Sequence, residues 1–416
     1  MIKKIVNGKL VFPDRITEGT LIIKDDRIAS AFTADGTQIV PDPGAQIVPD
    51  PGTGAGMSSV PEDAEIIDAA GLFVGPGLID EHVHGYHQHG KGFDIIDNTR
   101  AVADAHLMHG VTSVTPSPSY SLRMDRYLSI IEQCNRAIEE GGSSIIGIHL
   151  EGPYINPRMG AGRKYAWKYS EEAFTRLFEA GRGNVLHCTY APEMLFADKV
   201  EDVIHRYHVT ADIGHTMADP ASMYRAVEKG AKIITHLFDA TGNYQGVHAS
   251  DLTDDPQDGV SMVALSIPGL YYEIISDKNG VHVTPASQRL ALRCAGEDHI
   301  ILVSDCTYHK RADLDPEEYP QTDLGSGGDI NVNREGKLFG SRITVADGAA
   351  NFMRATGADI RVTFKCASTN AARALGIDDR VGSILPGRMA NIIFTDEKFS
   401  VKKVIFEGKE QEMYLS

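Results

Sequence analysis

The chain has 416 residues and a formal charge of −17, because 57 acidic side chains outnumber 40 lysines and arginines. Such an excess of negative charge argues against a surface that binds nucleic acid or acidic lipid. A hydrophobic fraction of 42% and a charged fraction of 23% are ordinary for a globular protein and exclude a disordered or collagen-like chain.

The sequence contains no membrane or secretion signal. Its apolar runs stay shorter than the ~18 residues that a spanning helix needs, so we expect no contact with a membrane. The apolar start is interrupted at Asn7, Gly8 and Lys9, too early for a signal peptide. The 5 cysteines are odd in number and lack CxxC spacing, which speaks against a disulfide framework or a thiolate zinc site. We expect a cytoplasmic protein with reduced thiols.

The first part of the chain has strand character. Short strands are predicted at 4–6, 9–12, 20–24 and 27–32, with turn signals at Asn7-Gly8 and Asp25-Asp26, so we expect a small antiparallel sheet. The segment 38–44 recurs intact at 46–52, and a Gly/Ser/Pro-rich stretch follows to residue 61. Its prolines cannot donate to a β-ladder, which predicts an exposed insertion.

From residue 74 to about residue 382, apolar runs alternate with amphipathic stretches. The runs lie at 144–149, 185–189, 209–213, 232–234, 270–275 and 300–304. Helices are predicted at 124–140, 170–180, 223–229 and 285–295. This alternation predicts a parallel sheet with helical crossovers, and so many units favour a closed barrel. Strand character returns at 390–395 and 401–406, so both chain ends are expected in one small β-domain beside the barrel.

His82 and His84 stand two residues apart in the apolar run 78–85. On a strand such residues share one face, so both imidazoles can point into one barrel mouth. An HxH pair alone is a weak signal, because it also fits polar residues at a strand end. Its position after Gly75-Pro76-Gly77, at the entrance to the barrel pattern, favours a metal site.

Four further apolar runs end in a polar side chain with metal or acid–base chemistry: Glu151, His215, His236 and Asp305. A barrel displays its functional groups at the carboxyl ends of its strands. A single histidine there can be a packing residue, and a single carboxylate can cap the next helix. Five strand ends with this property are hard to explain by packing alone, so we predict one site built from all of them.

Imidazole and carboxylate ligands without thiolate predict a divalent metal. They suit zinc first, and also iron, manganese or cobalt. The nearby carboxylate of Asp305 is then placed to accept a proton from water and to pass it to a leaving amine. A structural metal in a non-catalytic binding barrel stays open as an alternative.

Several motifs carry a resemblance to a known family. The segment 79–85 resembles the first metal motif of the amidohydrolase superfamily. The other matching segments are 149–153, 191–193, 214–215, 235–238, 340–341, 370–376 and 382–387. Together they resemble the N-acetylglucosamine-6-phosphate deacetylase family over nearly the whole chain apart from 38–61. The resemblance implies a homodimer and an α/β fold: a distorted (β/α)8 TIM-type barrel at 74–384 and a β-sandwich domain of 1–73 plus 385–416.

The resemblance also implies roles for single residues. Glu151, His215 and His236 would hold the principal metal, and Asp305 would be the catalytic acid and base. Since His82 and His84 are both present, the chain would hold one or two ions, with Glu151 bridging a pair.

The substrate pocket matches the family less closely. His282 corresponds to a family histidine that contacts the sugar, but Asp239-Ala240-Thr241 stands where the family has Asn-Ala-Met. The segment 242–259 lacks the expected arginine and carries Asp251, Asp254, Asp255 and Asp258, which would repel a phosphate dianion. A phosphate would then need other cations, namely Arg163, Lys164 or Lys278. Gly160-Ala-Gly-Arg163 also replaces a segment in which the family commonly has a histidine.

The sequence therefore predicts a metal-dependent amide hydrolase that removes the acetyl group from an N-acetylated amino sugar, with its phosphorylation left open. A different N-acyl or cyclic amide substrate is the alternative. His282, Asp239 and Ala240 are the predicted substrate contacts. Cys306 lacks a paired base and is interpreted as a packing residue, and His87 and His89 are expected in a loop above the site.

Overall fold

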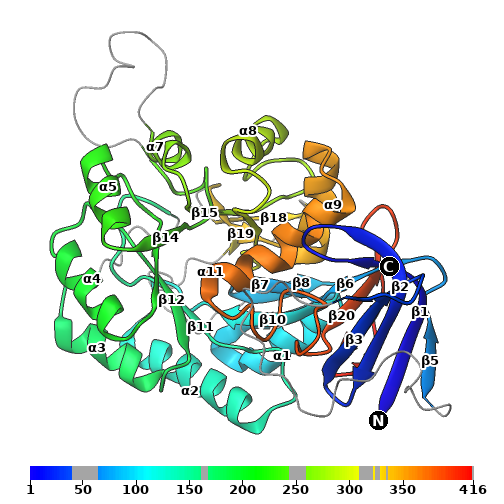
Figure 1. Cartoon of the computed structure of the whole chain (residues 1–416). Helices are drawn as coiled ribbons and strands as arrows, with labels where there is room; N and C mark the ends of the chain where they lie inside the picture. The colour runs from blue at the N-terminus through cyan, green and yellow to red at the C-terminus, as the bar shows by residue number, and fades with distance from the viewer. Residues whose placement is uncertain are drawn as a thin grey trace.

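The computed structural model describes residues 1–39, 64–160, 167–242, 259–308, 322–323, 328–333 and 336–414. Figure 1 shows an α/β part, in which helices surround parallel strands, and a separate mostly-β part that contains both chain ends. Of the predicted insertion at 38–61, the first two residues form the short strand β4 (Gln38–Ile39), and residues 40–61 lie outside the described residues.

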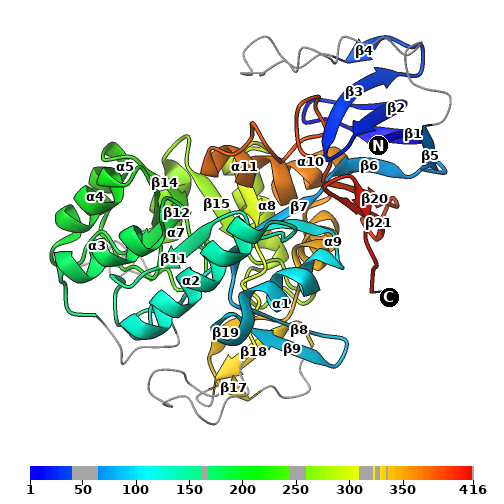
Figure 2. The ribbon, with the colours of Figure 1, turned by 90° about the horizontal axis from the view of Figure 1, so that it is seen from below.

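The mostly-β part is one nine-stranded sheet in the described chain, with the strand order β22-β21-β20-β6-β1-β2-β3-β4 and with β5 paired to β1. Its strands are β1 (Ile2–Val11), β2 (Ile16–Lys24), β3 (Arg27–Thr33), β4 (Gln38–Ile39), β5 (Glu65–Asp68), β6 (Phe73–Pro76), β20 (Ile392–Thr395), β21 (Val401–Phe406) and β22 (Lys409–Glu410). Since β20 pairs with β6, the two chain ends share this sheet. Figure 2 shows the same blue and red strands side by side.

Two predictions for this region were wrong. The Asn7-Gly8 signal does not end a strand, because β1 continues through it with a bulge between Ile5 and Gly8, and Asn7 takes a φ of +56°. Tertiary packing overrides the local turn preference here, since a Cβ on Gly8 would lie only 2.7 Å from Cγ2 of Val74. The sheet is also mixed rather than antiparallel, because β1 pairs in parallel with β5 and β6. The hairpin at Asp25-Asp26 is confirmed by the antiparallel pairing of β2 with β3.

The α/β part contains a curled parallel sheet. Its strands are β7 (Leu78–Val83), β10 (Val111–Pro116), β11 (Ile148–Glu151), β12 (Val185–Tyr190), β13 (Thr210–Ile213), β14 (Ala231–Ile234), β15 (Tyr271–Ile274) and β16 (Ile300–Leu302). β11 to β16 pair in chain order and β10 pairs with β7, all in parallel. Isolated parallel bridges join Val114 to Ile145 and Val83 to Cys306. The predicted parallel sheet with helical crossovers is thus confirmed.

The helices of this part are α1 (Ile95–Leu107), α2 (Met124–Glu140), α3 (Glu171–Ala180), α4 (Ala197–Arg206), α5 (Pro220–Glu228), α7 (Val260–Ser266) and α8 (Pro285–Ala295). The predicted bounds of α2 and α8 are confirmed. Polar caps set several starts: Ser170 accepts a hydrogen bond from the Ala173 amide at α3, and Asp219 accepts one from the Ser222 amide at α5. Because of the Asp219 cap, α5 begins three residues earlier than the predicted residue 223.

Four helical segments lie between β19 and β20. They are α9 (Val345–Thr356), α10 (Ile360–Phe364), a π-helix (Lys365–Thr369) and α11 (Asn370–Leu375). Ser368 Oγ donates to the carbonyl of Gly77, just before β7, and Asn370 Nδ2 donates to the carbonyl of Ile300, where β16 begins. The π-helix and α11 therefore lie against the amino ends of the parallel strands and do not cover the carboxyl ends.

Short hairpins lie near those carboxyl ends: β8 (Gly85–Gln88) with β9 (Lys91–Asp94), and β18 (Ile330–Asn333) with β19 (Leu338–Ser341) and β17 (Thr322–Asp323). No helix among the described residues combines the length and the apolar character that a membrane span requires.

Candidate metal centre

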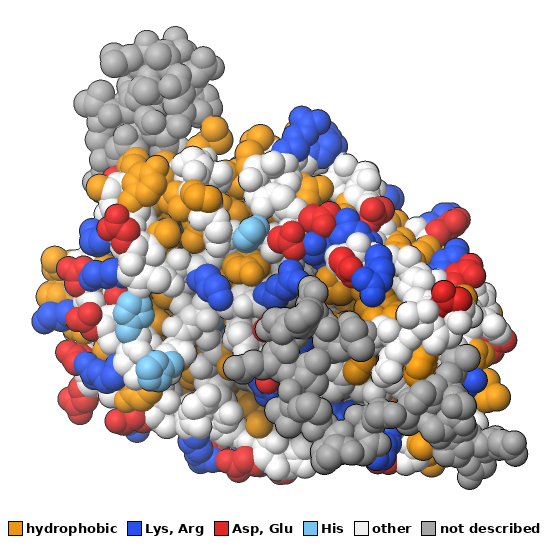
Figure 3. Space-filling view, in the orientation of Figure 1, with side chains coloured by type: hydrophobic (Ala, Val, Ile, Leu, Met, Phe, Trp, Pro, Cys, Tyr) orange, Lys and Arg blue, Asp and Glu red, His pale blue; other side chains and the backbone are white. Residues whose placement is uncertain are grey.

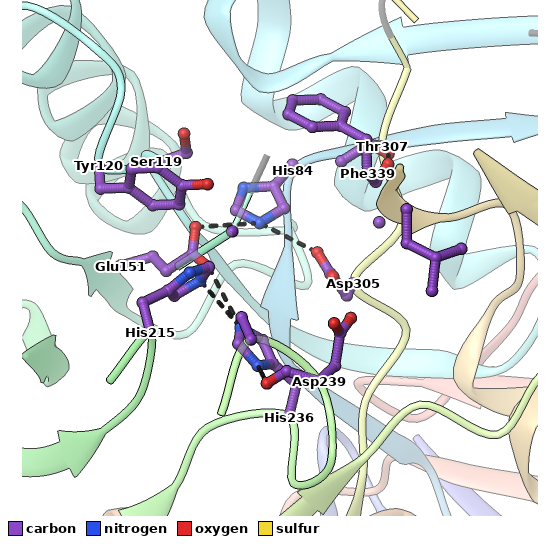
Figure 4. A pocket seen from close by; sticks show the side chains of 14 residues that line it. His84, Ser119, Tyr120, Glu151, His215, His236, Asp239, Asp305, Thr307 and Phe339 are labelled. Atoms are coloured by element: carbon purple, nitrogen blue, oxygen red, sulfur yellow. Dashed lines mark hydrogen bonds and ion pairs between the residues drawn. The ribbon is translucent and has the colours of Figure 1, made fainter. Parts of the chain in front are cut away.

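The six residues that the sequence predicts for the metal and for proton transfer lie together at the carboxyl ends of the parallel strands. They are His82, His84, Glu151, His215, His236 and Asp305. Figure 4 shows five of them around one cavity. None is more than 8% exposed. Buried polar groups of this kind need partners, because burial without a partner is costly.

Three of these residues hold a strained backbone. His215, His236 and Asp305 follow β13, β14 and β16, and their φ angles are +45°, +31° and +45°. Residues other than glycine rarely adopt this left-handed backbone conformation, and those that do cluster at functional sites. The conformation turns each side chain from the strand end into the common cavity. The strain thus points to the same residues that the sequence pattern singled out.

The first ligand group consists of Glu151, His215 and His236. The distance from His215 Nε2 to Glu151 Oε1 is 2.7 Å, and the distance from His215 Nε2 to His236 Nε2 is 3.0 Å. His236 Nε2 lies 3.6 Å from Glu151 Oε1. Three donor atoms on three strand ends therefore face one point.

The second group lies on the other side of Glu151. His82 Nε2 is 3.4 Å from Glu151 Oε1, and His84 Nε2 is 3.5 Å from Glu151 Oε2. Asp305 Oδ1 lies 3.2 Å from His84 Nε2 and 4.0 Å from His82 Nε2. The carboxylate of Glu151 thus stands between two groups of imidazoles, as a bridging ligand would.

Hydrogen bonds fix which nitrogen of three histidines faces the centre. Nδ1 of His82 contacts Glu273 Oε2 at 3.0 Å, Nδ1 of His236 contacts the carbonyl of Asp239 at 2.9 Å, and Nδ1 of His84 contacts the carbonyl of Ser117. Carbonyl and carboxylate oxygens only accept, so each Nδ1 carries the proton. Each Nε2 then presents a lone pair to the centre, which is the usual arrangement of metal-binding histidines.

This donor set fits a divalent metal. Ligand atoms about 2.1 Å from a tetrahedral ion lie about 3.4 Å from one another, and the measured separations range from 2.7 to 3.6 Å. His82 Nε2 is buried and lacks a hydrogen-bond partner among the described residues. Imidazoles with one bridging carboxylate could hold one ion or two.

The electrostatics keep both carboxylates charged. Burial raises the pKa of Glu151, but His215, His236 and His82 outweigh it and hold that pKa well below its ordinary value. Burial also raises the pKa of Asp305, while His84 and His82 lower it, and the net pKa is below the ordinary value. Both groups are therefore ionised near neutral pH.

The predicted substrate contacts are only partly brought together. Asp239 and Ala240 line the cavity over the ligand group, whose volume is about 60 Å³. His282 is buried beside it and does not line it; its Nδ1 lies 3.2 Å from Asp277 Oδ2, and its Nε2 lacks a described partner. Gly160 also lines the cavity, at a φ of +79°, and a Cβ there would lie 2.6 Å from His215 Nδ1.

The sequence analysis missed Glu273, which lies on β15 beneath the ligand groups. It is fully buried, and its Oε2 accepts hydrogen bonds from both His82 Nδ1 and the backbone amide of His236, each at 3.0 Å. One oxygen therefore ties together two predicted ligands from different strands. The available signal was an acidic residue inside the apolar run 270–275, where every neighbour is apolar or aromatic.

A second buried group, His149, His187 and Asp212, also has metal-binding side chains, but its geometry favours packing. The two rings stack with centroids 4.0 Å apart and planes 9° from parallel, so their lone pairs cannot converge on one ion. His187 Nδ1 contacts Asp212 Oδ2 at 2.6 Å, and His149 contacts Ser117 and Thr189. We interpret this group as a hydrogen-bonded layer of the sheet interior.

The other described residues singled out from the sequence do not line the cavity over the ligands. Cys306 is buried, and burial raises the pKa of its thiol, which fits packing rather than nucleophilic attack. His87 lies in β8 and His89 in the turn to β9, so they belong to a hairpin near the carboxyl ends of the strands rather than to the expected loop. His87 contacts Arg342, and His89 stacks on His109. Arg163, Lys164 and the four aspartates Asp251, Asp254, Asp255 and Asp258 lie outside the described residues. Lys278 lines a neighbouring hollow of about 710 Å³ together with Arg342 and Arg354.

The chain is similar to known enzymes along most of its length. A sequence model of the amidohydrolase family matches residues 73–410. The chain is 27% identical over 361 residues to N-acetylglucosamine-6-phosphate deacetylase of Bacillus subtilis (strain 168), covering 84% of this chain and 87% of that protein. It is 26% identical over 344 residues to N-acetylgalactosamine-6-phosphate deacetylase of Escherichia coli O157:H7, covering 80% and 86%.

The fold is also similar to solved structures. The crystal structure of N-acetylglucosamine-6-phosphate deacetylase from Pasteurella multocida superposes with a TM-score of 0.81 at 21% identity, covering 99% of this chain and all of that one. That similarity concerns the fold. Because the family model spans well over half of the sequence and includes every predicted ligand, the chain belongs to the amidohydrolase family.

Proposed function

We propose that the protein is a metal-dependent deacetylase that hydrolyses the N-acetyl group of an amino sugar 6-phosphate. One observation carries the proposal: Glu151, His215 and His236 converge beside His84 and Asp305 at the carboxyl ends of the strands. The printed names of relatives, which act on N-acetylglucosamine 6-phosphate or N-acetylgalactosamine 6-phosphate, support this substrate class.

The residues of the chain would divide the reaction between them. Glu151, His215 and His236 would hold the principal ion, and His82 and His84 a second one. A bound divalent ion supplies hydroxide at neutral pH and polarises the acyl oxygen.

Asp305 would act as the general base and then as the general acid. Its ionised carboxylate would accept the proton of the attacking water and donate it to the leaving amine as the amide bond breaks. Its backbone is fixed for this role, since its amide donates to the carbonyl of His82 and its carbonyl accepts from the amide of Ser341. The products are acetate and the free amino sugar.

Lys278 is the described candidate for holding the phosphate. Its hollow adjoins the cavity over the ligands, because Gly340 lines that cavity and Arg342 lines the hollow. The lining of the hollow combines the cations of Lys278, Arg342 and Arg354 with the carboxylates of Asp329 and Asp347. The guanidinium of an arginine binds a phosphate as a fork, and the ammonium of a lysine binds it as a point charge. Lys278→Gln should therefore raise the KM for a phosphorylated substrate and leave that for the unphosphorylated sugar unchanged.

Several finer features complete the proposal. The bridges Val114–Ile145 and Val83–Cys306 support a closed eight-stranded barrel at 74–384. The sheet shared by both chain ends supports one β-domain of 1–73 plus 385–416, for which we propose a β-sandwich. The ligand set suits zinc, with iron, manganese or cobalt as alternatives, and Glu151 would be shared if two ions were held. We also propose that the protein is a homodimer and lies in the cytoplasm.

An acetate-release screen tests the function. Metal-loaded protein should release acetate from N-acetylglucosamine 6-phosphate or its galactosamine epimer, and more slowly from the unphosphorylated sugars. Release of ammonia or of another acid from a different amide, with no acetate from any of these sugars, would favour the alternative amidohydrolase activity. Metal binding without hydrolysis of any tested amide would favour a non-catalytic barrel.

A further inference from the structure

A separate cavity of about 240 Å³ lies at the junction of the mostly-β part and the last helices. Its lining comes from the turn 12–15 between β1 and β2, from Thr369 and Arg373, and from the loop that precedes β20. Those helices lie against the amino ends of the strands, as the bond from Asn370 to the carbonyl of Ile300 shows. The cavity is therefore at the opposite end of the sheet from the candidate metal centre.

Arg388 lines this cavity and is only 5% exposed. Its backbone is fixed, because its amide donates to the carbonyl of Leu385 and its carbonyl accepts from the amide of Ile28. Its guanidinium Nε is buried without a hydrogen-bond partner in the described chain. The two other lining arginines are paired: Arg15 with Asp14 at 2.6 Å, and Arg373 with Asp298 at 3.1 Å.

Burial of a guanidinium is unfavourable unless each of its donors finds an acceptor, and the buried Nε of Arg388 has none among the described residues. Burial lowers the pKa of Arg388 and the exposed carboxylates of Asp378 and Asp379 raise it, but a guanidinium stays protonated at neutral pH. The guanidinium presents five donors in a planar fork, which matches the oxygens of a carboxylate or a phosphate. Such a group needs either an anion or water in the cavity.

The rest of the lining is mixed. It contains two carboxylates, that of Asp14, which is paired with Arg15, and that of the exposed Asp378. Its other side chains suit a small anion with some apolar surface. Ser383, 8% exposed, adds a hydroxyl donor to the same lining as Arg388. Phe12, Val381 and Leu385 supply apolar walls. A few placed polar groups in an otherwise apolar hollow are typical of small-molecule sites.

We propose that this cavity, the Arg388 pocket, binds a small oxyanion, a phosphate or a carboxylate, through the guanidinium of Arg388 and the hydroxyl of Ser383. A ligand there would contact segments from 12–15, 369–373 and 378–388, and so would couple the mostly-β part to the end of the barrel. The site is independent of the proposed deacetylase reaction, because its lining shares no residue with the cavity over the metal ligands.

The test is calorimetric titration of the full-length, metal-loaded protein with inorganic phosphate and, separately, with acetate. Arg388→Gln removes the fork, and Ser383→Leu fills the cavity while keeping the guanidinium. Each change should weaken the binding of the preferred anion about 10- to 100-fold. Arg27→Gln is the matched control, since Arg27 is exposed, donates to the neighbouring carbonyl of Gly387 and does not line the cavity; it should change the affinity less than twofold.

All three variants should keep their metal content and their rate of acetate release, which separates this site from the catalytic one. Binding of only phosphate or only acetate would identify the class of the ligand. Anion binding that neither Arg388→Gln nor Ser383→Leu weakens, or no anion binding to the unsubstituted protein, would overturn the proposal. If Arg388→Gln does not fold, Ser383→Leu alone decides the question.

Discussion

Replacing Glu273 by alanine should weaken metal binding at the candidate centre about 10- to 100-fold, because loss of the partner that orients a ligating histidine has this effect in metal sites. That range corresponds to about 1.4–2.8 kcal/mol. Glu273 is suited to such a role because it is fully buried and because a single oxygen holds His82 Nδ1 and the amide of His236, both at 3.0 Å. The pKa of Glu273 is raised by burial but lowered more by His82 and His236, so the carboxylate is charged.

The alanine variant should also lose folding stability. Two donors, His82 Nδ1 and the His236 amide, would be left buried and unpaired, at about 1–3 kcal/mol each. Removal of a buried carboxylate offsets part of this cost. Glu273→Gln keeps an oxygen in place and should lie between alanine and the unsubstituted protein in metal affinity.

Metal affinity is measured by competition with a chromophoric chelator, and the ligand geometry by the visible spectrum of the cobalt form. Glu297→Gln is the control, because Glu297 pairs with Arg361 and Lys365 at the other end of the strands and should leave cobalt binding unchanged. An alanine variant at position 273 with unchanged cobalt affinity, stoichiometry and spectrum would refute the reasoning.

Three further predictions concern other parts of the site. Asp305→Asn should keep its metal and lose about 10²–10⁴-fold in acetate release, and an unchanged rate would remove its role in proton transfer. Gly160→Ala should lower zinc affinity, because its Cβ would lie 2.6 Å from His215 Nδ1; Gly71→Ala, which has the same φ of +79° and open space around it, isolates the cost of backbone strain. Burial lowers the pKa of His282, but its hydrogen bond with Asp277 raises the net pKa above 6.5. This pair therefore stabilises the fold fully below pH 6.5, and the contribution is lost as pH rises through the raised pKa. The free energy of unfolding, measured with urea between pH 6 and pH 9, should fall less steeply with pH in Asp277→Asn than in the unsubstituted protein. An equal fall in both proteins would contradict the assignment.

The sequence predicts best what local periodicity and strand direction determine. The bounds of α2 and α8 follow from amphipathic spacing, and the convergence of His215, His236 and Asp305 follows from the common direction of parallel strands. The predictions that were wrong concern features that depend on contacts between distant segments. The turn signal at Asn7-Gly8 gives way to pairing and to the close approach of Val74, neither of which can be deduced from neighbouring residues.

Residues inside the sheet were missed for a related reason. Glu273 and Asp212 lie within apolar strands, where an acidic residue has no local explanation, and their partners His82 and His187 are 191 and 25 residues away in the chain. The burial of Arg388, whose Nε has no hydrogen-bond partner in the described chain, is likewise a property of the folded chain, since a charged residue in a loop is ordinarily exposed. The sequence could predict the groups that face the metal, but not those that hold them.

The central claim is that Glu151, His215 and His236 bind one divalent ion. Anomalous diffraction from crystals of the zinc-loaded protein, measured at the zinc absorption edge, tests it directly. The account predicts a strong peak about 2.0–2.2 Å from Glu151 Oε1, His215 Nε2 and His236 Nε2, with any second peak beside His82 and His84. A strongest peak elsewhere, with these three atoms beyond bonding distance of any ion, would contradict it.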